Sequence, residues 1–308
     1  MLDVGLGLPI LVPDAGPRAA IDFARRAEEA GAHSVWVGDR LVFRNQEPLL
    51  NLAAAAAVTS RVKLGTCVLL ATLRPPALLA KMVASLDQMS DGRVILGVGV
   101  GSRADDFAAE QLDFEHRGGR AEELVDILRL AWAEEPLKYG GRFYDIDVGP
   151  VGPRPAQAHI PIWFGGSAES ALRRIGRIGD GFIGGSGGGP DGFRASWEKI
   201  RRYAEAEGRD PASITPAALI YACVDDDRSR AEELAAAHLR HYYGPRRTDT
   251  SSFLLGSVDE CLRVATAYAA AGVRTFIIGS VTAEPRYLDR LCDQLLPRLL
   301  QIEEVAAR

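Results

Sequence analysis

Three glycine-rich stretches are the segments of this chain best suited to hold a ligand. They are residues 97–101 followed by Ser102, the run Gly165-Gly166-Ser167, and residues 184–189, in which Ser186 stands among glycines. Glycine lets a backbone approach a ligand closely, and free N–H groups at a helix N-terminus attract phosphate. The stretches therefore predict a cradle for a phosphorylated ligand, with simple strand-to-helix turns as the alternative.

A charged pair, Asp39-Arg40, directly follows the apolar run that ends in Trp36-Val37-Gly38. Burying charge is costly unless the charge is paired or used, so these are the candidate catalytic residues. Asp39 could accept hydrogen bonds from a ligand ring or orient Arg40, and Arg40 could hold an anion. The alternative is a mutual ion pair. Arg74 and Arg103 are further anion candidates, or else solvated surface charges.

The histidines and acidic residues predict no metal site. No pair of histidines has the helical spacing of a zinc motif. His238 and His241 lie near a predicted helix end, and the run of acids at 225–227 reads as a turn before a helix. Because no tight cluster of acids, bases and nucleophiles is found, we expect a cofactor to carry the chemistry.

Two motifs within the glycine stretches favour other enzymes. Residues 184–188 match the Gly-x-Ser-x-Gly elbow of hydrolases, with Ser186 as nucleophile and His238 or His241 as its base. A helix should follow the elbow at once, but Gly189-Pro190 intervenes. Residues 97–101 resemble part of a dinucleotide fingerprint, but the spacing is incomplete and no acid ends a strand about 20 residues later.

The elements that must position these residues alternate between strand and helix. Eight short apolar runs predict buried parallel strands. They are Val4–Pro9, Ser34–Gly38, Val62–Leu70, Val94–Val100, Pro161–Phe164, Gly181–Ile183, Ala217–Val224 and Thr275–Ile278. Eight such strands alternating with helices favour an α/β fold of the closed (β/α)8 TIM-barrel type, with an open doubly wound sheet as the alternative. Since no composition break divides the chain, we expect residues 1–308 to form a single domain.

Several helix signals and two insertions complete this pattern. Apolar residues spaced three and four apart predict a helix from Ala20 that stops at Gly31, and Ser257 with Glu260 forms a capping box. The last helix is interrupted by Pro297. Residues 117–153 are too long for one crossover and contain a predicted helix over 120–134 and a hairpin at 139–144. Residues 242–256 form another long connection.

Composition excludes several classes of protein. The chain has 308 residues, a net charge of −5 and four widely separated cysteines. No uncharged run reaches the ~20 apolar residues of a membrane helix, and the first residues do not resemble a signal peptide. We therefore expect a cytoplasmic protein that acts on a small molecule, with no membrane and no nucleic-acid partner.

The order of these motifs resembles that of the bacterial luciferase-like superfamily, whose members use FMN or the deazaflavin coenzyme F420. The segments that carry the resemblance are 27–39, 59–66, 86–99, 161–167, 179–182, 208–211 and the helix start at 256–257. The small-chain deazaflavin branch is the most similar one. The resemblance implies a luciferase-like TIM barrel with insertions, and relatives are often homodimers.

The resemblance also implies which residues would meet the cofactor. It assigns a non-proline cis peptide against the ring to Cys67-Val68, and it places Gly99 and Gly101 beside the ring or the side chain of the cofactor. We expect Asp39 to orient or polarise groups near the ring. The resemblance assigns the phosphate to the following loop residues: Gly165, Gly166, Ser167, Gly185 and Ser186. Two departures matter: Arg40 stands where many members have histidine, and Ser102 stands where the sugar-phosphate dehydrogenase branch has an acid. Oxidation of glucose 6-phosphate is therefore not expected.

The leading hypothesis is an F420-dependent oxidoreductase that moves a hydride to or from a small organic substrate. The alternative is an FMN-dependent luciferase-like monooxygenase that uses reduced flavin and O₂. A non-enzymatic cofactor carrier is a third interpretation, since a barrel fold alone does not fix function.

Overall fold

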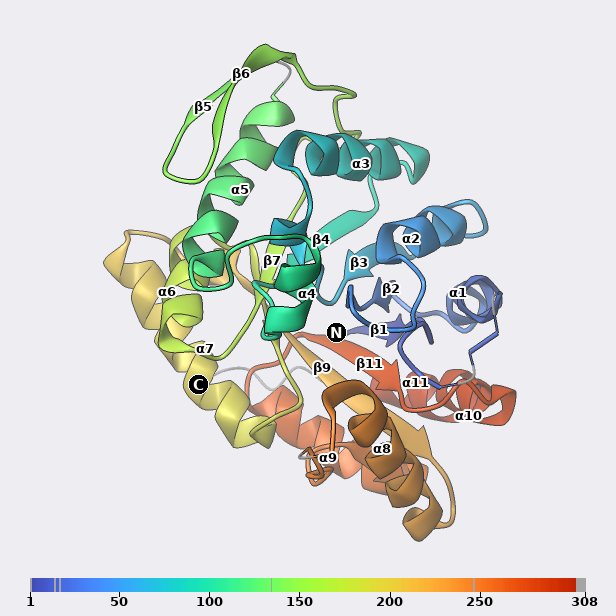
Figure 1. Ribbon diagram of the computed structural model, residues 1–308. Coiled ribbons are helices and arrows are strands. Elements are labelled where there is room, and N and C mark those ends of the chain that lie inside the picture. The colour runs from blue at the N-terminus through green and yellow to red at the C-terminus, as the bar shows by residue number, and fades with distance from the viewer. Residues whose placement is uncertain (1, 14, 17, 134, 246, 303–308) are drawn as a thin grey trace.

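The computed structural model describes residues 2–13, 15–16, 18–133, 135–245 and 247–302. Eight parallel strands stand at its centre, surrounded by helices (Figure 1). The strands are β1 (Asp3–Gly7), β2 (Ser34–Val37), β3 (Lys63–Thr66), β4 (Val94–Val98), β7 (Ile162–Gly165), β8 (Gly181–Gly184), β9 (Thr215–Val224) and β11 (Thr275–Ser280). Each coincides with one of the eight predicted strands.

The sheet closes on itself. The strands pair in the order β1, β2, β3, β4, β7, β8, β9 and β11, and β11 pairs with β1. This is the predicted (β/α)8 barrel, and the open doubly wound sheet is wrong. A three-residue strand that the sequence did not predict, β10 (Leu254–Gly256), extends the sheet beside the end of β9. Among the described residues, no helix is long and apolar enough to span a membrane.

The helices cover the outer face of the barrel (Figure 1). They are α1 (Ala19–Glu29), α2 (Pro48–Ala56), α3 (Pro76–Met89), α4 (Ala104–Ala109), α5 (Arg117–Ala131), α6 (Glu169–Ile178), α7 (Gly189–Ala206), α8 (Arg228–Tyr243), α9 (Val258–Ala270), α10 (Pro285–Arg290) and α11 (Leu296–Leu299). Short 3₁₀ turns lie at Ala71–Leu73 and Pro211–Ser213.

The predicted helix signals are confirmed. The helix that opens near Ala20 ends before Gly31, and Ser257 and Glu260 form the capping box of α9. The last helix changes to a π-helical turn at Leu291–Leu295, directly before Pro297. Proline has no N–H to donate to the preceding turn, which explains an interruption at this point.

Two tryptophans fill the barrel interior, and glycines on the strands make room for them. The rings of Trp36 and Trp163 lie 5.4 Å apart between centroids. A Cβ atom on Gly65 would overlap the Trp36 ring, and one on Gly181 would overlap the Trp163 ring. Glycine in a strand interior costs stability, but at these positions it lets two large side chains pack. These glycines are therefore explained by packing.

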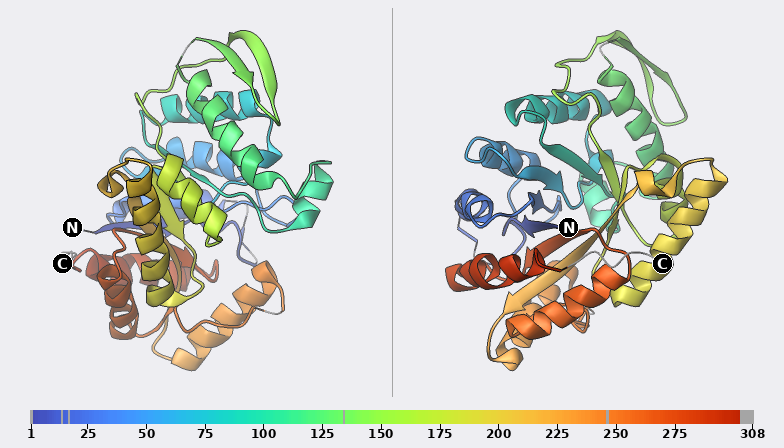
Figure 2. Two further views of the ribbon diagram at one scale, coloured as in Figure 1. Left: turned by 90° about the vertical axis from the view of Figure 1, so that its left-hand side faces the viewer. Right: turned by 180° about the vertical axis from the view of Figure 1, so that it is seen from behind.

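The predicted insertion at 117–153 contains a helix and a hairpin. The helix is α5, and four residues separate its end from the hairpin of β5 (Pro136–Gly140) and β6 (Asp145–Pro150), which pair antiparallel. Residue 134, the predicted end of the helix, lies outside the described residues. The Glu123 carboxylate accepts hydrogen bonds from the amides of Arg142 and Phe143, which fastens the hairpin turn to α5. The hairpin and α8 lie at opposite ends of the molecule (Figure 2).

The amino-terminal side of the barrel is held by a buried arginine. Arg93 precedes β4, and its guanidinium donates to the carbonyls of Ser90, Val62, Ala56 and Thr59. Burial lowers the pKa of this guanidinium. Main-chain carbonyl oxygens, rather than carboxylates, thus accept the hydrogen bonds of the buried guanidinium. These bonds connect the end of α2, the residue before β3 and the end of α3 to the start of β4. This end of the barrel contributes stability, and the opposite end is available for a site.

Candidate active site

Val68 lies where the ends of β3, β4 and β7 meet. The peptide bond between Cys67 and Val68 is cis, as the resemblance implied. The Val68 side chain occupies the space beside two glycines: a Cβ on Gly99 would overlap its Cγ2, and a Cβ on Gly165 would lie 3.1 Å from its Cγ1. The structure therefore brings Val68, Gly99 and Gly165 together at the carboxyl ends of the strands, where Val68 and Gly165 are partly exposed and Gly99 is buried; we call these three residues the shelf.

Gly101 and Gly166 adopt backbone angles that favour glycine. Their φ values are +77° and +133°, and a Cβ on Gly166 would lie 2.9 Å from the Cβ of Ala171. Residues other than glycine rarely adopt such backbone angles. The carbonyl of Gly101 accepts a hydrogen bond of 3.0 Å from Arg117 Nε, which fixes the loop after β4.

The first phosphate candidate is the turn between β7 and α6. Gly166 and Ser167 are exposed and directly precede α6, whose first amides lack helical partners as at any helix start. An acidic residue in this turn, Glu169, would repel an anion. However, its carboxylate is bound to Lys199 Nζ at 2.9 Å and to the Tyr203 hydroxyl, both on α7. The negative charge is thus neutralised on the far side of the helix.

The second phosphate candidate is the loop after β8. Nothing lies within 4 Å of a Cβ built on Gly185, so the backbone there faces open space. The carbonyl of Ser186 accepts a 2.6 Å hydrogen bond from the Ser252 hydroxyl, which joins this loop to the connection that precedes β10. The loop is therefore anchored on one side and open on the other.

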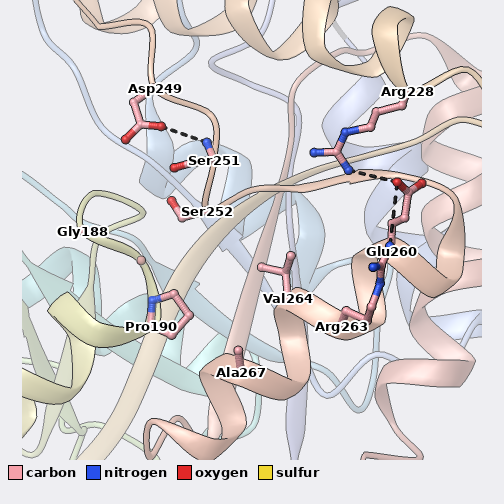
Figure 3. A pocket seen from close by; sticks show the side chains of 11 residues that line it. Gly188, Pro190, Arg228, Asp249, Ser251, Ser252, Glu260, Arg263, Val264 and Ala267 are labelled. Atoms are coloured by element: carbon pink, nitrogen blue, oxygen red, sulfur yellow. Dashed lines mark hydrogen bonds and ion pairs between the residues drawn. The ribbon is translucent and has the colours of Figure 1, made fainter.

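A hollow of about 610 Å³ adjoins this second loop (Figure 3). It lies between the start of α7 at Gly188 and Pro190 and the side chains of α9. Two arginines line it: Arg228 Nη1 binds Glu260 at 3.1 Å, while Arg263 is 77% exposed and lies 3.9 Å from the same carboxylate. Arg263 is thus the cation of the hollow that is freest to meet an anionic ligand.

Asp39 is buried in the wall of the barrel mouth. Its Oδ2 accepts hydrogen bonds from the Leu70 amide at 3.0 Å and from Arg74 Nη1 at 2.8 Å. Arg74 also binds Glu47 at 2.8 Å. Burial alone would lower the pKa of the Arg74 guanidinium, but the two carboxylates outweigh it and raise that pKa. Arg74 is therefore a paired wall residue, and its interpretation as a solvated charge is wrong.

Arg40 is bound to other partners than Asp39. Its Nε lies 3.4 Å from the Asp106 carboxylate, and its Nη1 donates to the main-chain carbonyl of Tyr242. Arg103 donates to the same carbonyl at 2.8 Å. The mutual ion pair of Asp39 and Arg40 is therefore wrong, and so is the expectation that Asp39 orients Arg40. Two arginines from separate loops instead hold the carboxyl end of α8, and the interpretation of Arg103 as a solvated charge is also wrong.

A small, partly open pocket of about 50 Å³ lies inside the mouth, beside the shelf. Its polar lining groups are Cys67, Tyr221, His238 and Ser280. Burial raises the pKa of the Cys67 thiol to about 12 and lowers the pKa of the His238 imidazole to about 4. Sequence reasoning considered His238 only as a hydrolase base, because its spacing matches no motif and only the packing of α8 against β9 brings it to the mouth.

His238 also decides against the hydrolase interpretation. Among the described residues, neither of its ring nitrogens has a hydrogen-bond partner, so it does not activate Ser186. His241, the other candidate base, is exposed and packs its ring against Phe43. A Ser-His catalytic pair is therefore not assembled around the Gly-x-Ser-x-Gly sequence.

The residues of the mouth fit a flat ring with a phosphorylated tail. Ligand sites commonly enclose several hundred Å³, so the pocket beside His238 is too small for a three-ring heterocycle. On the shelf, Val68 and Gly165 are partly exposed, and positions 99 and 165 carry no side chain. Both glycine loops, 165–167 and 184–189, follow strands adjacent to this shelf. The geometry thus favours the ring on the shelf and its tail along these loops.

Comparison with known proteins agrees with this arrangement. The family model for luciferase-like monooxygenases matches residues 6–277. An F420-dependent glucose-6-phosphate dehydrogenase of Kineococcus radiotolerans is 34% identical over 238 residues, which cover 74% of this chain and 70% of the relative.

Solved structures show the same fold. An F420-dependent secondary alcohol dehydrogenase, in complex with an F420-acetone adduct, matches with a TM-score of 0.83 at 21% identity, over 97% of this chain and 99% of that one. Monooxygenase RslO1 from Streptomyces bottropensis matches with a TM-score of 0.82 at 23% identity, over 96% and 99%. With the family model spanning nearly all of the barrel, the chain belongs to the luciferase-like monooxygenase family of oxidoreductases.

Proposed function

We propose that the protein is an F420-dependent oxidoreductase that transfers a hydride to or from a small organic substrate. The observation that carries the proposal is the shelf made by the Val68 side chain between Gly99 and Gly165, beside two exposed glycine loops. Relatives at 32–34% identity that are F420-dependent dehydrogenases support it. Ser102 stands where the sugar-phosphate branch has an acid, so we propose a substrate other than glucose 6-phosphate.

The chain's own residues would bind and orient the cofactor. The deazaflavin ring supplies a hydride acceptor or donor when bound. The cis peptide at Cys67-Val68 and the glycines would support its flat face, and the amides of Gly166, Ser167, Gly185 and Ser186 would hold its phosphate. Asp39 holds the Leu70 amide and would thereby position the cis-peptide segment that meets the cofactor, and Arg40 holds the carboxyl end of α8. We assign both charged residues positioning roles.

The hollow beside α7 supports F420 over FMN. FMN ends at its phosphate, whereas the tail of F420 continues past its phosphate to carboxylates. The hollow begins at Gly188, two residues beyond Ser186, and presents the exposed guanidinium of Arg263. A longer anionic tail would gain this contact and FMN would not. The FMN-dependent monooxygenase is the second candidate, supported by the family model.

Fluorescence titration with each cofactor tests the proposal. We expect F420 to bind at least about tenfold more tightly than FMN. Arg263→Glu should weaken F420 binding by about three- to tenfold and leave FMN binding unchanged. The control is Arg201→Glu, the same charge change at an exposed residue of α7. Arg201 lies about 18 Å along α7 from Gly189 at the edge of the hollow, so this variant should change neither affinity. Tight FMN binding with negligible F420 affinity would overturn the proposal in favour of the monooxygenase.

A further inference from the structure

An arginine lies against the loop after β8, which carries no charge of its own. Residues 184–189 consist of five glycines and Ser186. Arg247, from the connection between α8 and β10, comes so close that its Nη1 would lie 3.3 Å from a Cβ atom built on Gly187. Arg247 and Gly187 are both exposed, so a ligand that reaches this part of the loop can also reach the guanidinium.

The segment that carries Arg247 is fastened to the same loop. The Ser252 hydroxyl donates to the Ser186 carbonyl at 2.6 Å, and the Ser252 Cβ would lie 3.5 Å from a Cβ built on Gly189. The connection therefore packs against the loop at Ser186, Gly187 and Gly189. Gly185, by contrast, has nothing within 4 Å of an added Cβ, so the loop is left open at that residue.

An aromatic ring supports the guanidinium. Arg247 Cζ lies 5.4 Å from the centroid of the Tyr243 ring. Tyr243 is itself held, because its hydroxyl lies 2.9 Å from that of Tyr221 and its ring lies 4.6 Å from that of Tyr242. A cation over an aromatic face is attracted to it, and a side chain already held in place loses less freedom when it binds a ligand. Arg247 is thus positioned before any ligand arrives.

The charge of Arg247 has no carboxylate partner among the residues that the structure describes. Asp249, two residues along the chain, accepts a hydrogen bond of 2.9 Å from the Ser251 amide. The hydrogen bonds from Ser251 lower the pKa of Asp249 the most, and the charge of Arg247 has a smaller effect on it. The guanidinium therefore remains available to an anion.

We propose that Arg247 binds the phosphate of the cofactor together with the amides of Gly185 and Ser186. The inference rests on the proposed function, in which this loop holds that phosphate, and it adds a side chain that the resemblance does not assign. A guanidinium can donate two hydrogen bonds to one phosphate, which gives a stronger contact than neutral amides alone. Arg263, in the hollow, would instead meet the tail beyond the phosphate. Arg247 would thus act on the group that F420 and FMN share.

Fluorescence titration with two matched pairs of ligands tests this contact. The pairs are F420 with the ribityl-deazaflavin that lacks its phosphate and tail, and FMN with riboflavin. Arg247→Gln should weaken F420 binding by about five- to twentyfold and leave the affinity for the phosphate-free deazaflavin within about twofold of wild type. FMN binding should fall similarly, and riboflavin binding should not change. Arg201→Gln, the same change at an exposed residue far along α7, is the control and should alter none of these affinities.

Phosphorus-31 NMR gives a readout that does not depend on turnover. The phosphate resonance of bound F420 should differ between the wild type and Arg247→Gln, because the guanidinium no longer contacts the phosphate in the variant. Arg247→Lys keeps the positive charge without the planar fork, so it should recover part of the lost affinity. Identical phosphate resonances in the wild type and Arg247→Gln would overturn the proposal.

A second variant tests the contact from the side of the loop. Gly187 has no positive φ, so its backbone can carry a side chain. Gly187→Val places methyl groups where Arg247 Nη1 now lies and should weaken F420 binding by about three- to tenfold. In the Arg247→Gln background the same substitution should cause little further loss, and thermal melts check that every variant folds. Additive losses would show that the two residues act separately, which would overturn the contact.

The outcomes separate the two proposals. If wild-type protein binds FMN but not F420, the proposed function is overturned, and the FMN pair alone decides the role of Arg247. If F420 binds and Arg247→Gln keeps the wild-type affinity, only the role of Arg247 is overturned. An equal loss of affinity for F420 and for the phosphate-free deazaflavin also overturns that role, because Arg247 would then act on something other than the phosphate. If neither cofactor binds, both proposals are overturned.

Discussion

Arg74 Nη1 lies 2.8 Å from Asp39 Oδ2, across 35 positions of sequence. The Asp39 side chain is 5% exposed and that of Arg74 is 19% exposed, so water contributes little to the pair. The same carboxylate holds the Leu70 amide, just beyond the cis peptide. Through Asp39, the arginine after β3 thus stabilises the segment from the cis peptide to Leu70, which borders the candidate cofactor site.

Removal of Arg74 should leave the Asp39 charge buried and unpaired. Arg74→Met is therefore expected to lower the free energy of unfolding by about 3–5 kcal/mol. The double variant Asp39→Asn with Arg74→Met should recover part of this loss, because an amide can still accept from Leu70. Urea denaturation of the two single variants and the double variant gives the coupling energy. A coupling energy near zero would contradict a structural role for the pair.

The contact between Gly99 and Val68 should determine the position of the Val68 side chain on the shelf, and with it the affinity for F420. Gly99→Ala places a methyl group where Val68 Cγ2 now lies, so Val68 must move and F420 binding should weaken by at least about tenfold. Adding Val68→Ala should free the space and restore most of the affinity. Fluorescence titration of the two single variants and the double variant checks this. Equal losses in Gly99→Ala and in the double variant would show that Val68 is not the group that moves.

Gly166 and Gly185 offer a matched comparison of strain and ligand contact. Gly166→Ala should cost about 1–3 kcal/mol, since φ is +133° and Ala171 is close. The Cβ added by Gly185→Ala meets open space, so the melting temperature of this variant should equal that of the wild type. If the loop holds a phosphate, Gly185→Ala should still weaken F420 binding. Thermal melts and titrations separate the two effects, and unchanged F420 affinity in Gly185→Ala would remove this loop from the site.

His238 should make stability depend on pH. Its pKa is lowered from about 6.5 in the unfolded chain to about 4 in the folded one. Between these values the unfolded state binds more protons, so stability falls as the pH drops from 6.5 toward 4. Between pH 8 and pH 5, the free energy of unfolding of the wild type should therefore fall by about 2 kcal/mol more than that of His238→Phe. Denaturation of both proteins at each pH measures the difference, and parallel pH curves would contradict the buried, neutral state of His238.

Local patterns predicted the barrel well, because each strand is an apolar run bounded by glycine or charge. All eight strands were located, and so were the capping box of Ser257 and the hairpin after α5. The prediction for β3 ran to Leu70, whereas the strand ends at Thr66 where the cis peptide turns the chain. The strand β10 was missed, since a run of three residues is stable only when β9 pairs with it.

The candidate site was predicted less completely, since its contacts join residues far apart in sequence. The glycines at 99 and 165 could be named in advance, but their shared neighbour Val68 could be placed only by resemblance. The partners of Asp39 and Arg40 depend on which loops meet across the mouth, and adjacency in sequence was misleading there. His238 was considered only as a hydrolase base, because its isolation from hydrogen-bond partners is a property of tertiary packing alone.

The helix α8 is attached to the mouth through a main-chain carbonyl oxygen, a group that every amino acid has. Arg40 and Arg103 both donate to the carbonyl of Tyr242, and neither needs the phenol ring for this bond. Mutation at position 242 can thus change the ring that packs against Phe43, His238 and Tyr243 while the carbonyl bond of the helix is kept. Losing either arginine would instead weaken the attachment of the helix end, whatever side chain stands at 242.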